Sequence, residues 1–116
     1  MSGIHFNLND NDAILKINSP KNRVGGPYLV VQKSIAERWA IVAMEWDKKP
    51  ALAIRWFHGN RGNPLSFSHP TWVVIPFVLC KGILLSLSLD TELRDKIDDF
   101  LNQKLSGNDL KNENSG

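Results

Sequence analysis

The chain of 116 residues contains a single cysteine, Cys80, so no disulfide bond can form within it. A chain with one thiol is typical of a reducing compartment, and we expect the cytoplasm. The sequence also lacks an uninterrupted apolar run of about 20 residues, the length that a membrane-spanning helix needs. Its most apolar stretch, 72–89, is broken by proline, glycine, serine and lysine. The sequence therefore predicts a cytoplasmic protein that does not contact a membrane.

Acidic residues are missing from the middle of the chain, because residues 48–89 carry lysine and arginine but no aspartate or glutamate. The whole chain is nearly balanced, with 14 basic and 12 acidic residues and a formal net charge of +2. So small an excess does not favour nucleic acid as a partner. A weak nucleic-acid binder stays an alternative, and its aromatic and basic candidates are Arg55, Trp56, Phe57, Arg61 and Phe67.

The hydrophobic fraction of 42% and charged fraction of 22% fit one globular domain of ordinary size. β-Branched and aromatic residues predict strands over 28–31, 38–46, 51–58 and 71–75. Apolar residues predict helices over 76–86 and, at clear helical spacing, over 92–105. The predicted fold class is therefore α+β, a four- to five-stranded antiparallel sheet with C-terminal helices packed on it. We expect a single domain over 1–105 and a flexible polar tail over 106–116.

The two central strands form a hairpin around 47–50, in which we expect Trp46 to face Ala51. Both faces of this hairpin are largely apolar, so both must be covered. One face carries three alanines, Ala40, Ala51 and Ala53, which would allow a helix or another subunit to approach closely. Few helices are available to cover both faces, so we predict a homodimer. The alternative is that the N-terminal segment and the 76–86 helix cover everything.

Metal and cofactor chemistry have little support in the sequence. The histidines at 5, 58 and 69 and the thiol of Cys80 show no pair at the spacing of a zinc motif. We predict no metal site and no cofactor.

The alternative function is enzymatic: the protein would be a small hydrolase that uses His58 or His69 as the base and Ser66 or Ser68 as the nucleophile. No Gly-x-Ser-x-Gly motif is present, and no acid between 48 and 89 orients a histidine locally. The sequence therefore favours a non-enzymatic binding or interaction protein.

The long connection 58–70 is the most unusual segment of the chain, because it combines glycine, asparagine, histidine and arginine. Two glycines permit a backbone nest for an anion, and Arg61 and Arg55 add positive charge. Arg55 lies on an otherwise apolar strand face and needs a partner if it is buried. We expect a small anionic ligand or a protein partner to bind here. The candidate binding residues are Arg55, Trp56, His58, Asn60, Arg61, Asn63, Ser66 and His69.

A set of residues between about 40 and 102 follows a pattern: Arg55-Trp56, Gly62-Asn63-Pro64, Ser66, Pro70-Thr71-Trp72 and Pro76. This segment resembles a family of small, uncharacterised bacterial proteins, some of which are encoded on mobile gene cassettes of the integron type. The resemblance implies a compact α+β bacterial protein. No activity is established for that group, so the resemblance assigns no catalytic residue.

Overall fold

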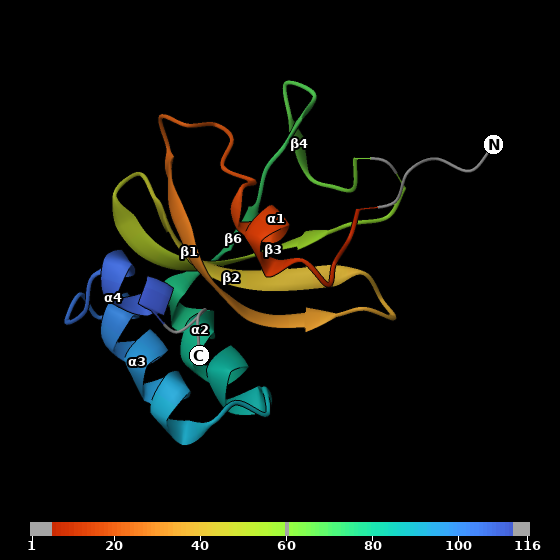
Figure 1. The fold of residues 1–116 in the computed structure, drawn as a ribbon. Helices are drawn as coiled ribbons and strands as arrows, with labels where there is room; N and C mark the ends of the chain where they lie inside the picture. Colours follow the sequence, from red (N-terminus) through yellow and green to blue (C-terminus); the bar gives the residue numbers. More distant parts are fainter. Residues whose placement is uncertain (1–5, 60, 113–116) are drawn as a thin grey trace.

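The computed structural model describes residues 6–59 and 61–112. Strands β1, β2, β3 and β6 form one antiparallel sheet in that order, and β4 and β5 form a separate small hairpin. This arrangement confirms the predicted α+β fold (Figure 1). The elements are α1 (Asn11–Leu15), β1 (Val24–Ser34), β2 (Trp39–Trp46), β3 (Lys49–Trp56), β4 (Leu65–Ser66), β5 (His69–Pro70), β6 (Val73–Ile75), α2 (Phe77–Ser86), α3 (Thr91–Leu101) and α4 (Gly107–Lys111).

The β2–β3 hairpin differs from the prediction in register but not in its division into faces. Met44, and not Trp46, faces Ala51. The connection is a two-residue turn at Asp47 and Lys48, whose φ angles are 52° and 70°. Positive φ at both positions matches the twist of the flanking strands in a type I′ turn. Because the register is shifted by two residues, each side chain still points to the predicted face.

Both faces of the sheet are covered by the chain itself (Figure 1). Helices α2, α3 and α4 pack on one face, around buried residues that include Leu52, Ile97 and Phe100. The N-terminal segment with α1 covers the other face, where Ala40 and Ala53 are fully buried. The prediction that this alanine face is a surface for a second subunit is wrong. The alternative, internal coverage, is what the structure shows.

The N-terminal segment is held on the sheet by side chains that donate to its backbone. Lys33 Nζ donates to the carbonyl oxygen of Leu8 at 2.7 Å, and Trp72 Nε1 donates to that of Ile17 at 2.8 Å. Within the segment, the carboxylate of Asp10 accepts from the backbone N–H of Ala13 and so caps α1. These bonds, together with buried Ile14 and Leu8, fix a segment that has little regular structure.

The C-terminal region differs from the prediction. Helix α3 ends at Leu101 and not at residue 105, because the chain turns at Gln103 with a φ of 63°. A further helix, α4, follows where a flexible tail was expected. Ser106 and Asp109 cap it reciprocally, and Leu110 is fully buried in the core. The predicted tail is therefore wrong for 106–112, and residues 113–116 lie outside the described part of the chain.

Helix α2 confirms the helix predicted over 76–86 and begins one residue after Pro76. It presents Cys80 and Leu84 to the core, while Phe77, Val78, Leu79 and Leu85 are exposed. A helix that is apolar on all sides usually lies in a core or an interface. Across the described residues, we find no helix with both the length and the apolar character to span a membrane.

Candidate functional site

Arg55 is the centre of the candidate site and is only 1% exposed. Its position in β3 directs its side chain to the sheet face that the N-terminal segment covers. The guanidinium Nη1 donates to the carbonyl oxygens of Pro64 at 3.1 Å and Thr71 at 2.6 Å. Nη2 donates to the carbonyl oxygen of Arg61 at 2.5 Å. Arg55 therefore holds both arms of the loop 58–70 against the end of β3.

The buried guanidinium has no acidic partner among the residues that the structure describes. Burial lowers the pKa of Arg55 to about 10, which leaves the side chain protonated at neutral pH. Among the described residues, Arg23 pairs with Asp47 and Lys96 with Glu92, whereas no carboxylate pairs with Arg55. The ring of Phe57 lies 5.0 Å from the guanidinium carbon and stabilises the charge through its π face. The carbonyl dipoles and this ring therefore offset the cost of burying the positive charge, a role that a carboxylate usually has.

Part of the hydrogen-bonding capacity of Arg55 is unused. A guanidinium has five N–H donors, and the three observed bonds take both on Nη1 and one on Nη2. Nε is shielded from solvent and has no acceptor within the described structure. The hydroxyl of Thr71 is likewise buried without a partner there. Unsatisfied buried donors are rare in native proteins, so Arg55 Nε and the Thr71 hydroxyl stand out among the described side chains.

Backbone hydrogen bonds give the loop its shape. Trp56 and Asn63 pair in both directions, with N···O distances of 2.8 and 3.1 Å. The N–H of Gly62 donates to the carbonyl oxygen of His58 at 3.0 Å. Gly62 has a φ of 63°, and a Cβ there would lie 2.1 Å from the carbonyl oxygen of Trp56. Only glycine fits this position, both for its conformation and for the close approach.

A cavity of about 80 Å³ lies beneath the loop. It brings two arginines, Arg55 and Arg61, to walls that are otherwise apolar, with Gly59 and Gly62 in the lining. A positive charge on apolar walls attracts a small anion and excludes a cation. The remaining lining residues are Phe6, Ile17, Phe57 and Pro70.

Seven of the eight predicted site residues lie in the described part of the chain, in or next to this loop, and they differ in role. Arg55 and Arg61 line the cavity together. The side chain of Trp56 points to the opposite sheet face from Arg55, because neighbouring strand residues alternate. The imidazole of His58 and the amide of Asn63 are exposed, and these residues contribute backbone atoms. Asn60 lies outside the described residues.

Ser66 and His69 lie apart from the cavity and face each other across the β4–β5 hairpin. In the part of the chain that the structure describes, neither His58 nor His69 is hydrogen-bonded to a hydroxyl or a carboxylate. That part also contains no group of three histidine, cysteine or acidic side chains placed to hold a metal. For the hydrolase alternative, the hairpin therefore places one serine opposite one histidine. Among the described residues, no acidic side chain is placed to orient that histidine.

Sequence reasoning missed the apolar half of the cavity. Phe6 and Ile17 come from the N-terminal segment, far from the loop in sequence, and nothing local signals their position. Phe57 had a better signal, because it lies on the same strand face as Arg55, two residues away. Its ring also packs on that of Phe6, with centroids 4.6 Å apart.

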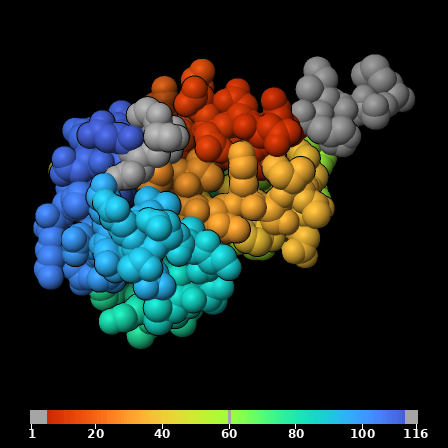
Figure 2. All heavy atoms as spheres, turned by 60° about the horizontal axis from the view of Figure 1, so that its bottom comes forward, coloured from red at the N-terminus to blue at the C-terminus, as the bar shows by residue number. Residues whose placement is uncertain are grey.

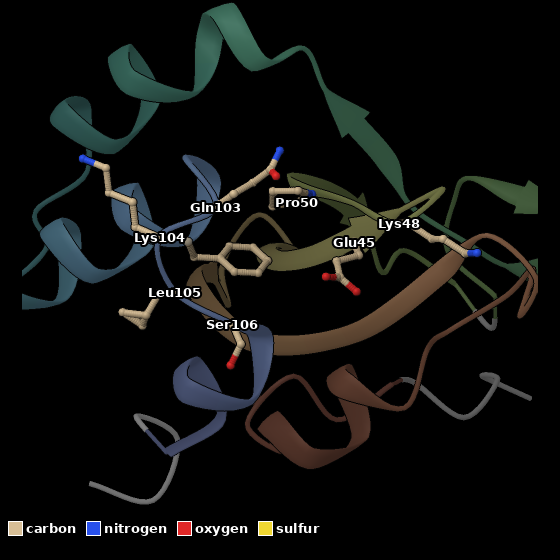
Figure 3. Close-up of a pocket in the computed structure, with 8 residues that line it drawn as sticks. Glu45, Lys48, Pro50, Gln103, Lys104, Leu105 and Ser106 are labelled. Atoms are coloured by element: carbon tan, nitrogen blue, oxygen red, sulfur yellow. The ribbon is translucent and has the colours of Figure 1, made fainter.

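A second, more open hollow of about 330 Å³ lies between the β2–β3 hairpin and the α3–α4 connection (Figure 3). Glu45 projects into it, and the phenol of Tyr28 donates to Glu45 Oε1 at 2.8 Å. Burial, followed by this carboxylate, raises the pKa of Tyr28 to about 12. The amines of Lys48 and Lys104 point outward in different directions (Figure 3). The charged groups of this hollow therefore do not converge on one point, whereas those of the Arg55 cavity do.

Comparisons with known proteins find no relative of this chain. The resemblance to small bacterial proteins therefore stays a prediction. No protein-family model, no curated protein and no solved structure matches this chain.

Proposed function

We propose that this protein is a non-enzymatic, cytoplasmic binding protein whose ligand is a small anion held by Arg55 and Arg61 beneath the loop 58–70. The observation that supports the proposal is the guanidinium of Arg55, which is buried and protonated with no carboxylate against it in the described structure. Its unpartnered Nε–H lies on the same edge of the guanidinium as Nη2. Two neighbouring oxygens of a carboxylate or phosphate bind such an edge with paired hydrogen bonds.

The size and walls of the cavity restrict the ligand class. A volume of about 80 Å³ is smaller than a cofactor site and suits a few non-hydrogen atoms. Arg61 is exposed at the loop and adds a second charge without being fixed by an ion pair in the described structure. The proposal therefore concerns anions of the size of acetate or inorganic phosphate, including the terminal group of a larger molecule.

Ligand-induced thermal stabilisation tests this proposal. Acetate and inorganic phosphate are titrated against the protein at constant ionic strength, with acetamide as the uncharged analogue of acetate. We expect saturable stabilisation by at least one anion and none by acetamide, because a ligand that binds only the folded state raises its stability. Arg61→Gln should lose most of this effect. Equal responses to acetate and acetamide, or an unchanged response in Arg61→Gln, would refute the anion site.

We also propose that the protein is a homodimer, although not through the sheet face first expected. The supporting observation is the row of exposed apolar side chains on α2, in which Val78 is 83% exposed and Phe77 63% exposed. Exposed apolar residues that adjoin one another are unusual on a monomer and typical of interaction sites. The solution mass as a function of concentration tests this part: a constant monomer mass would contradict it.

A further inference from the structure

We infer that two copies of this chain bind each other through the outward face of helix α2, antiparallel across a two-fold axis that passes near Gly82. This inference rests on the proposed homodimer and names its surface. Helices α2 and α3 lie beside each other on the face that Figure 2 brings forward, with α2 in teal at the lower edge. No other element of the described chain covers the outward side of α2, which is exposed over most of its length.

The helical period gathers one set of side chains on this outward face. Val78, Gly82 and Leu85 are spaced by four and three residues, so they lie above one another. Leu85 in this row is 59% exposed, and Leu79 beside the row is 53% exposed. Cys80 and Leu84 point the opposite way, into the core. The outward face is therefore a distinct surface and not the edge of the core.

Gly82 lies at the middle of this face, and a Cβ atom built on it would meet nothing within 4 Å. Packing inside the monomer therefore does not require glycine there. The backbone of α2 has normal helical geometry at this residue, so conformation does not require glycine either. A small residue at the centre of an apolar helix face lets a second helix approach closely, with larger side chains packing on both sides.

The available area is sufficient for a weak dimer. With Phe77 at the start of the helix included, the exposed parts of Phe77, Val78, Leu79 and Leu85 amount to roughly 450 Å² per copy, so a two-fold dimer buries at most about 900 Å². This total is above most crystal contacts and below the roughly 1,200 Å² at which stable specific interfaces begin, which is the range of weak association. We therefore expect a dimer that dissociates on dilution.

The charges beside this face favour a second copy over a partner of one charge sign. A hollow of about 210 Å³ lies between α2 and α3, and both cations and acids line it. The cations are Lys81 and Arg94, and the acids are Asp95 and Asp98. A second copy presents the same mixture of cations and acids, so the rim as a whole has no net charge of one sign to repel it. A strongly acidic or basic partner would meet like charges here.

Sedimentation velocity over a wide concentration range tests the inference, with two variants on the face and one control. Gly82→Glu and Val78→Glu replace poor helix formers by a good one, so each should leave α2 intact. Both place a carboxylate where the interface must be dry. Ile35→Glu makes the same change at an apolar residue that is 46% exposed in the β1–β2 connection, outside α2.

We expect the wild-type protein and Ile35→Glu to dimerise alike. Gly82→Glu and Val78→Glu should dimerise at least about tenfold more weakly while keeping the circular dichroism spectrum of the fold. If both variants dimerise like the wild type, the homodimer stands and the α2 interface is refuted. If the wild type stays monomeric at all concentrations, the proposed homodimer fails together with this inference.

Discussion

The guanidinium of Arg55 donates a hydrogen bond of 2.6 Å to the carbonyl oxygen of Thr71, and this bond joins the end of β3 to the residue that leads toward β6. The two residues are separated by the whole loop 58–70. Two further bonds from the same guanidinium reach Arg61 and Pro64 inside that loop. One buried side chain thus organises the segment in which the sequence predicted a site.

The first prediction concerns stability. Arg55→Leu removes three hydrogen bonds and leaves backbone carbonyls without donors, which should lower the free energy of unfolding by about 3 kcal/mol. Arg61→Leu is the matched control, because Arg61 contributes its backbone carbonyl to this network and its side chain is exposed. Its effect should stay within about 0.5 kcal/mol. Urea unfolding measures both, and equal effects would show that Arg55 does not hold the loop.

A second prediction compares two glycines of the loop that both have positive φ. Gly62→Ala brings a Cβ within 2.1 Å of the carbonyl oxygen of Trp56, and it should cost about 2 kcal/mol or more. Gly59→Ala meets nothing within 4 Å and carries the conformational penalty alone, about 1 kcal/mol. Thermal unfolding of the two variants measures the difference. A larger loss in Gly59→Ala would contradict the close packing at Gly62.

A third prediction uses two glycines in helices. A Cβ on Gly107 would lie 2.3 Å from the ring of Tyr28, so Gly107→Ala should destabilise the protein by about 1–3 kcal/mol. Gly82→Ala adds its methyl group to open space within α2. At protein concentrations that keep the chain monomeric, it should stabilise by about 0.5–1 kcal/mol, since alanine is the better helix former. Chemical unfolding should therefore give changes in the free energy of unfolding with opposite signs for the two variants. Changes of the same sign would contradict the docking of α4 on Tyr28.

The phenol of Tyr28 gives a prediction on pH. Its pKa in the folded protein is about 12 and its ordinary value is 10.0, so the folded state holds this proton more tightly than the unfolded state. The stabilisation is complete below pH 10 and is lost as the pH rises toward 12. Tyr28→Phe keeps the ring and removes the hydroxyl that donates to Glu45. It should cost about 1 kcal/mol at pH 8.

The measurement is the difference in unfolding free energy between wild type and Tyr28→Phe from pH 8 upward. It should stay constant to about pH 10 and then shrink. A difference that grows above pH 10 would have the wrong sign for a phenol that donates to a carboxylate.

The sequence predicted the elements whose signals are local. Alternation located the hairpin strands and their two faces, and the helical spacing of apolar residues located α3. The register was wrong because a positive-φ turn at Asp47 and Lys48, without glycine, gives no clear sequence signal. The sequence did contain a signal for α4, which the predicted tail ignored. Ser106 and Asp109 have the spacing of a capping box.

The candidate site was predictable only in part, for a physical reason. Arg55 was found because a charged residue on an apolar strand face demands a partner. Its partners are backbone carbonyls, which every residue possesses and which no sequence pattern reveals. The apolar walls come from the N-terminal segment, whose path is fixed by Lys33 and Trp72 through long-range bonds. Such contacts depend on the complete fold.

The most direct test of the central claim is the NMR signal of the Arg55 Nε–H during titration with acetate and inorganic phosphate. An anion bound beneath the loop would accept from this group, so the signal should shift and saturate together with the amide signals of Gly59 and Gly62. Acetamide should leave all three in place. If the Nε–H signal stays unchanged while the anions shift only exposed lysines, the cavity at Arg55 does not bind anions.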